Sequence, residues 1–89
     1  MFSNTEDIVV ERFWNGRSFI IDDSEFVVYY SYYDNDHDRV FLKEHNQKRS
    51  CYVGINVRGD SIESRQDYRN EHFSKRFNIQ LTNIYFKWK

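Results

Sequence analysis

The sequence predicts an α+β domain: a small, curled antiparallel sheet, built as a meander of about five strands, with one helix near residues 60–77 and a final C-terminal strand. The composition favours strands, because eight Phe, seven Tyr and two Trp accompany only two Leu and no Ala. Alanine and leucine are among the best helix formers, whereas aromatic and β-branched residues fit pleated surfaces. Short polar turn signals divide residues 7–58 into strand-length pieces. With 89 residues and neither Pro nor a Gly/Ser linker, we expect a single domain over residues 1–89.

The first two expected strands are Asp7–Trp14 and Arg17–Asp22, joined by the pair Asn15-Gly16. Asn-Gly is a preferred two-residue sequence for a type I′ turn, because both central positions need a positive φ. The sequence therefore predicts a tight hairpin around Asn15-Gly16.

Three further strands are expected at Glu25–Tyr33, Arg39–Glu44 and Cys51–Arg58, separated by polar stretches. The last of them alternates with period two, which is the pattern of a half-buried strand. One of its faces is predicted to line the core, and it comprises Cys51, Val53, Ile55 and Val57. We interpret Cys51 as a small buried hydrophobic residue and not as a nucleophile.

The pattern changes after Gly59, where Asp60 or Ser61 is placed to cap a helix that extends to residue 77. Gln66 and Arg69 interrupt the apolar face of this helix. It also contains like-charge pairs four residues apart, which are unfavourable on a helix surface: Glu63/Asp67, Arg65/Arg69 and Asp67/Glu71. Residues Ile79–Lys89 are interpreted as the final strand.

No residue spacing points to catalysis, and we expect a non-enzymatic protein without a metal or another cofactor. The alternation of Asp34, Asp36 and Asp38 resembles the start of a calcium-binding EF-hand loop. The sixth and twelfth loop positions should then be Gly and Glu, but they are Arg39 and His45. The expected role of this stretch is therefore a solvated turn.

A tyrosine-rich strand followed by acids is the predicted partner-binding site. Successive strand residues point to opposite faces, so either Tyr29 with Tyr33 or Tyr30 with Tyr32 should meet solvent or a partner. The alternative is that the helix or the final strand covers the second face. Exposed tyrosines are typical of protein interfaces. The predicted site comprises Tyr29, Tyr30, Tyr32, Tyr33, Asp34, Asp36 and Asp38.

The charge is unevenly distributed along the chain, although the net charge is only −1. Residues 1–38 hold nine acidic and two basic residues, and residues 39–89 hold five acidic and eleven basic ones. This division favours a basic protein partner for the acidic half, unless hairpins interleave the two halves on one sheet. Basic residues next to aromatics in the second half suit single-stranded RNA or DNA as an alternative ligand. The residues of this alternative site are Arg49, Tyr52, Arg58, Lys87, Trp88 and Lys89.

These observations together favour a small protein–protein interaction module, with nucleic-acid binding as the less favoured alternative. Small standalone domains of this kind often serve as inhibitors, immunity proteins or accessory proteins of phages or mobile elements, and these are the expected classes. A composition without Ala or Pro also fits an AT-rich genome. The lone cysteine and the lack of a signal-like or membrane-spanning stretch indicate the cytoplasm, or the host cytoplasm for a viral protein. Monomer and homodimer are both compatible with the sequence.

Overall fold

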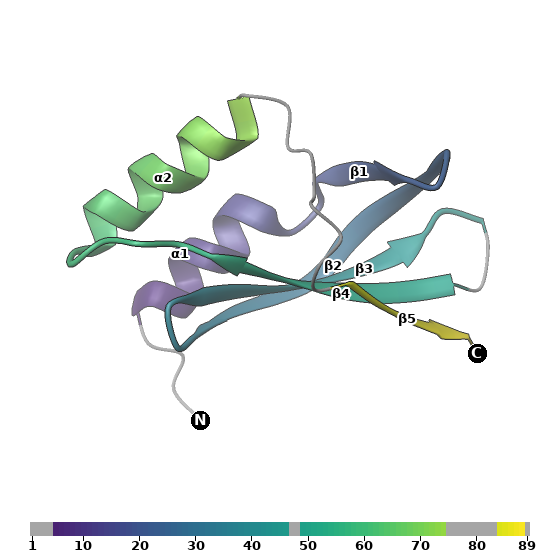
Figure 1. The fold of residues 1–89 in the computed structure, drawn as a ribbon, viewed down its shortest axis with the longest axis horizontal. Helices are drawn as coiled ribbons and strands as arrows, with labels where there is room; N and C mark the ends of the chain where they lie inside the picture. Colours follow the sequence, from purple (N-terminus) through teal and green to yellow (C-terminus); the bar gives the residue numbers. More distant parts are fainter. Residues whose placement is uncertain (1–4, 47–48, 75–83, 89) are drawn as a thin grey trace.

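The structure is a computed structural model that describes residues 5–46, 49–74 and 84–88. It has the predicted α+β class, with a curled antiparallel sheet whose first four strands form a meander in the order β1-β2-β3-β4. Two helices lie on the same side of this sheet (Figure 1). The elements are α1 (Thr5–Trp14), β1 (Ser18–Ile21), β2 (Ser24–Asp34), β3 (His37–Glu44), β4 (Arg49–Asn56), α2 (Ile62–Ser74) and β5 (Ile84–Trp88).

The backbone of β5 runs antiparallel beside β4 (Figure 1). Residues 75–83 and 89 of the expected strand Ile79–Lys89 lie outside the described residues. A complete C-terminal strand and a count of five strands therefore stay predictions.

The predicted N-terminal hairpin is wrong, because residues 5–14 form helix α1. Its buried residues are Glu6, Val10, Phe13 and Trp14, a spacing that places them on one helical face. Asn15-Gly16 ends this helix instead of turning a hairpin. Gly16 has a φ of 88°, the left-handed conformation that commonly follows a helix C-terminus.

The tight turns with two positive φ values lie elsewhere, at Asp22-Asp23 and Asn35-Asp36. The first connects the pair Ile21↔Ser24 between β1 and β2, and the second connects Asp34↔His37 between β2 and β3. Asn and Asp tolerate this conformation better than other non-glycine residues. Each hairpin therefore needs only two loop residues, and β3 begins earlier than the sequence indicated.

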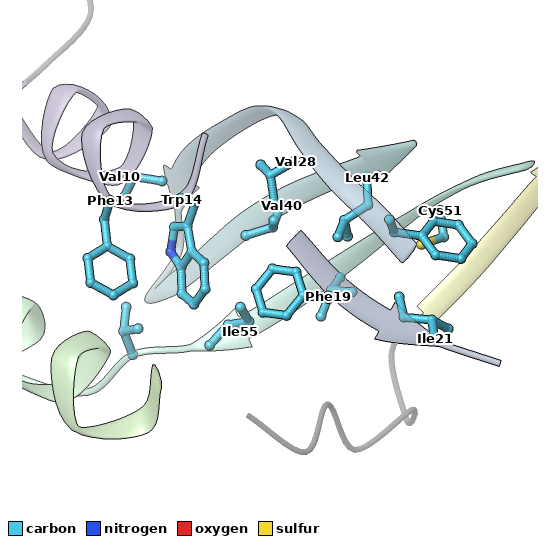
Figure 2. Packing of buried hydrophobic residues seen from close by; sticks show 13 residues of the cluster. Val10, Phe13, Trp14, Phe19, Ile21, Val28, Val40, Leu42, Cys51 and Ile55 are labelled. Atoms are coloured by element: carbon cyan, nitrogen blue, oxygen red, sulfur yellow. The ribbon is translucent and has the colours of Figure 1, made fainter. Parts of the chain in front are cut away.

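The hydrophobic core lies between the inner face of the sheet and α1 (Figure 2). The sheet contributes alternate residues of each strand, among them Phe26 and Val28 of β2. The predicted core face of β4 is confirmed, since Cys51, Val53 and Ile55, with Val57 just beyond the strand, are all buried.

The single helix predicted near residues 60–77 is confirmed as α2 over Ile62–Ser74, and residues 75–77 lie outside the described residues. Ser61 caps it, because the Ser64 N–H donates a hydrogen bond to Ser61 Oγ at 3.1 Å. Near its other end, the Phe73 ring lies 6.1 Å from that of Phe13 and 6.3 Å from that of Trp14, both in edge-to-face geometry. Among the described residues, neither helix is long and apolar enough to cross a bilayer.

Candidate functional site

Five aromatic side chains gather on the outer face of the sheet, opposite the core and the two helices. They come from three adjacent strands, and the register places Tyr30 opposite Phe41 and Phe41 opposite Tyr52. The ring centroids of these pairs are 5.5 and 5.4 Å apart. Such distances are typical of favourable aromatic pairs. We call this set the outer aromatic cluster: Tyr29, Tyr30, Tyr32, Phe41 and Tyr52.

A β-bulge in β2 decides which tyrosines reach the outer face. The register with β3 shifts between Val28 and Tyr30, so Tyr29 is the extra residue. Tyr29 and Tyr30 are consequently both well exposed, at 52% and 47%. Tyr32, which is partly buried, follows on the same outer face, with its ring centroid 5.6 Å from that of Tyr30.

Tyr33 lies on the inner face and packs against the core. Its hydroxyl donates a hydrogen bond to Asp36 Oδ1 at 2.9 Å. Burial and this hydrogen bond raise the pKa of Tyr33. The structure therefore separates Tyr33 from the three other tyrosines of the predicted partner-binding site.

The three acids of that site also separate. Asp34 is exposed at the end of β2, with its Oδ2 3.9 Å from Nη2 of Arg39. Asp36 lies in the turn and accepts the hydrogen bond from Tyr33. The prediction that Asp38 belongs to an exposed acidic site is wrong, because Asp38 lies in β3 and is 0% exposed. A residue on the inner face of the sheet cannot contribute to an exposed acidic loop.

Asp38 instead forms a buried ion network with Glu6, Arg65 and Arg69. Arg69 donates from Nε to Asp38 Oδ2 at 2.6 Å and from Nη2 to Asp38 Oδ1 at 2.8 Å. Its Nη2 also lies 2.8 Å from Glu6 Oε2. The indole Nε1 of Trp14 donates to Asp38 Oδ2 at 2.7 Å. The network joins α1, β3 and α2 across the core.

Sequence reasoning missed this network because Arg69 was interpreted as an interruption of an apolar helix face. Burial by itself lowers the pKa of Arg69, but its hydrogen bonds to Asp38 and Glu6 outweigh burial, so the pKa is raised. The like-charge pair Arg65/Arg69 is tolerated because both side chains bind Glu6, and Arg65 Nε donates to Glu6 Oε1 at 2.7 Å. An arginine on an otherwise apolar face was the available signal, because a buried charge requires a partner.

Charges of both signs surround the outer aromatic cluster. Lys43 Nζ lies 5.5 Å from the centroid of the Tyr29 ring. The guanidinium of Arg39 lies close to Gly54, where an added Cβ would be 3.3 Å from Nη1. Glu25 and Asp34 are exposed at the two ends of the neighbouring strand β2. The surface is therefore mixed in charge, and not acidic as the sequence suggested.

The residues of the alternative nucleic-acid site are not brought together among the described residues. Arg49 is held by Glu44, with Nη2 2.7 Å from Oε2, and its guanidinium lies 5.3 Å from the Phe26 ring centroid. The hydrogen bond to Glu44 raises the pKa of Arg49 and lowers that of Glu44. Tyr52 joins the outer aromatic cluster. The side chains of Lys87, Trp88 and Lys89 lie outside the described residues.

Arg58 is exposed beyond β4 and lines a polar cavity of about 390 Å³ near the turn between β2 and β3. His37 lines the same cavity, and its Nδ1 lies 2.8 Å from the carbonyl oxygen of Asn35. Within the described residues, no cluster of three His, Cys, Asp or Glu side chains is arranged to hold a metal ion.

Cys51 is buried, and burial raises the pKa of its thiol to about 11. Reactive cysteines are typically partly exposed with a lowered pKa. Cys51 has the opposite environment, which suits a core residue.

Comparisons with protein-family models, with curated proteins and with solved structures found no match. The geometry of the described residues is therefore the basis for the functional proposal below.

Proposed function

We propose that this chain is a small, non-enzymatic protein–protein interaction module that binds its partner through the outer aromatic cluster. The observation that carries the proposal is the exposure of Tyr29 and Tyr30 on the sheet face opposite the core. The inner face already buries the apolar side chains that the fold needs. Five outward aromatic rings are therefore more than folding requires, and tyrosine is among the residues that most often dominate binding energy.

The size and rigidity of the cluster fit this role. An aromatic side chain buries roughly 150–250 Å² when fully covered, and a standard interface takes about 800 Å² from each partner. Contact between the rings of Tyr30, Phe41 and Tyr52 restricts their rotamers before binding. Binding would then cost less conformational entropy, because these rings are already partly ordered in the free chain.

The charged residues at the margin favour a protein over a nucleic acid as the partner. Arg39 and Lys43 are offset by Glu25 and Asp34, so among the described side chains this surface shows no basic excess of the kind that phosphate binding uses. Mixed charge at a rim sets the orientation and the association rate of a protein complex. Stacking of bases on the same rings is the alternative, and it serves as the opposing outcome of the experiment below.

Expectations about cellular location, class of protein and the charge of the partner extend this proposal. The partner acts in the cytoplasm, and the chain serves as an inhibitor, an immunity protein or an accessory protein of a phage or mobile element. A basic protein surface is the expected partner of Asp34 and Asp36.

Affinity capture from the native cell lysate tests the proposal. The wild-type chain is immobilised beside a Tyr29→Ser/Tyr30→Ser variant and an Ile8→Ser control, which removes an exposed apolar side chain from α1. We expect a protein that survives nuclease treatment, binds the wild type and the control, and is lost from the tyrosine variant. Capture that nuclease abolishes, or that the tyrosine variant retains, would overturn the proposal.

A further inference from the structure

A groove of about 560 Å³ lies between α1 and α2, on the side of the molecule opposite the outer aromatic cluster. Its volume falls within the range of about 300–1,000 Å³ that is usual for ligand sites. Three apolar side chains line it: Val9 and Phe13 from α1 and Ile62 from α2. It can therefore accept an apolar group from a ligand.

The two sides of this groove carry opposite charges that do not pair with each other. Arg12 lies on the α1 side, and Glu63 and Asp67 lie on the α2 side. All three are exposed, and among the described residues none of them forms an ion pair within 4 Å. Glu63 and Asp67 are four residues apart, where like charges destabilise a helix. A ligand with charges of its own would relieve this repulsion.

Arg17 also lines the groove, but its guanidinium is already engaged. It lies 4.3 Å from the ring centroid of Phe13 and 4.0 Å from that of Phe73, and its Nε donates to the Phe13 carbonyl oxygen. Of the described residues that line the groove, Arg12 is therefore the cation that is free to meet a ligand.

Gln66 lines the groove, and one of its side-chain atoms is an acceptor without a donor among the described residues. Gln66 Oε1 is buried and has no partner, whereas its Nε2 lies 3.5 Å from Asn70 Oδ1. A buried polar atom that lacks a partner is costly. This acceptor lies on the same helix as Glu63 and Asp67, so that side of the groove favours a positively charged donor.

We propose that this groove binds a short peptide segment of a partner protein in which an apolar residue is flanked by a basic and an acidic residue. The apolar side chain lies on Val9, Phe13 and Ile62. The basic group binds Glu63 and Asp67, and the acidic group binds Arg12. This site goes beyond the proposed function, because it is a second surface that shares no residue with the outer aromatic cluster.

The test is an NMR titration of the full ¹⁵N-labelled chain with a capped Lys-Leu-Glu peptide. A capped Gln-Leu-Gln peptide is the matched neutral probe. We expect Lys-Leu-Glu to shift the amide signals of residues that line the groove, and Gln-Leu-Gln to bind at least several-fold more weakly. Equal binding of the two peptides, or no shift at millimolar concentration, would overturn the proposal.

Variants show whether the charges act as proposed. Glu63→Gln/Asp67→Asn should weaken Lys-Leu-Glu binding roughly fivefold, as expected for the loss of exposed ion pairs. Glu11→Gln/Asp23→Asn, which also replaces two exposed carboxylates but outside the groove, should leave binding unchanged. The melting temperature of each variant checks that it is folded. Shifts that map to the outer aromatic cluster, or that persist when the groove carboxylates are replaced, would contradict this inference without affecting the proposed function, which is tested at Tyr29 and Tyr30.

Discussion

Removal of Arg69 should be among the most destabilising single changes in the molecule. Arg69 and Asp38 are both 0% exposed, and Arg69 supplies two of the three hydrogen bonds that Asp38 receives from side chains in the network. Arg69→Met leaves Asp38 with the Trp14 indole alone. Loss of one partner of a buried ion pair costs about 3–5 kcal/mol. A domain of this length has a total stability of roughly 5–10 kcal/mol, so the variant should lose about a third of it or more.

Replacing both partners distinguishes a lost ion pair from general disruption. In Arg69→Met/Asp38→Leu no carboxylate is left buried beside Trp14, although the Trp14 N–H then lacks its acceptor. That orphaned donor costs about 1–3 kcal/mol, so the double variant should be more stable than Arg69→Met.

Urea unfolding followed by tryptophan fluorescence and circular dichroism gives the free energies. Arg12→Met, which removes an exposed arginine, is the matched control and should change stability by less than about 0.5 kcal/mol. A loss below 1 kcal/mol in Arg69→Met, or a double variant less stable than the single one, would refute the reasoning from burial.

Three further predictions concern single positions. Cys51 should react slowly with a thiol reagent at pH 8, and fast labelling would contradict its burial. Because its pKa is about 11, only the unfolded thiol ionises between about pH 9 and 11, so stability should fall as the pH rises through this range. The hydrogen bond from Arg49 lowers the pKa of Glu44, so the contribution of Glu44 to stability should be complete above the ordinary Glu pKa and should be lost as the pH falls through the lowered value. Arg49→Met should reduce this acid dependence in unfolding curves, and an unchanged dependence would count against the pair. Gly16→Val should cost about 1–2 kcal/mol, because φ is 88° at this helix end, and an unchanged melting temperature would show that the left-handed conformation is not needed.

The sheet was largely predictable because its strands carry local signals. Cys51, Val53 and Ile55 alternate with residues that do not enter the core, and the structure buries all three. The start of α2 was predictable for the same reason, since Ser61 is a preferred capping residue.

The sequence analysis predicts a strand where α1 forms. It gives more weight to the strand-favouring composition and to the Asn15-Gly16 pair than to the helical spacing of the apolar residues. Val9 and Val10 have a strand-like preference, and Asn15-Gly16 is a hairpin signal. The spacing of Val10, Phe13 and Trp14, however, fits one face of a helix, and packing of that face against the sheet decided the outcome. Asn-Gly suits both a hairpin turn and a helix end, because each uses a positive φ.

The candidate site was only partly predictable, because tertiary structure decides burial and register. The β-bulge near Tyr29 has no sequence signal that we can identify, yet it places Tyr29 and Tyr30 together on the outer face. Asp38 has the same local pattern as Asp34 and Asp36. Only the partner residue Arg69, 31 positions away, explains why Asp38 is buried.

The most direct test of the proposed interface is the dissociation rate of the captured partner from a biosensor. Tyr30→Ala should speed dissociation about thirtyfold, which corresponds to roughly 2 kcal/mol for a central tyrosine. Neutralisation of Arg39 and Lys43 at the margin should mainly change the association rate and its dependence on salt. If Tyr30→Ala leaves dissociation unchanged while charge reversal at Arg58 abolishes binding, the partner binds elsewhere and the outer aromatic cluster is not the interface.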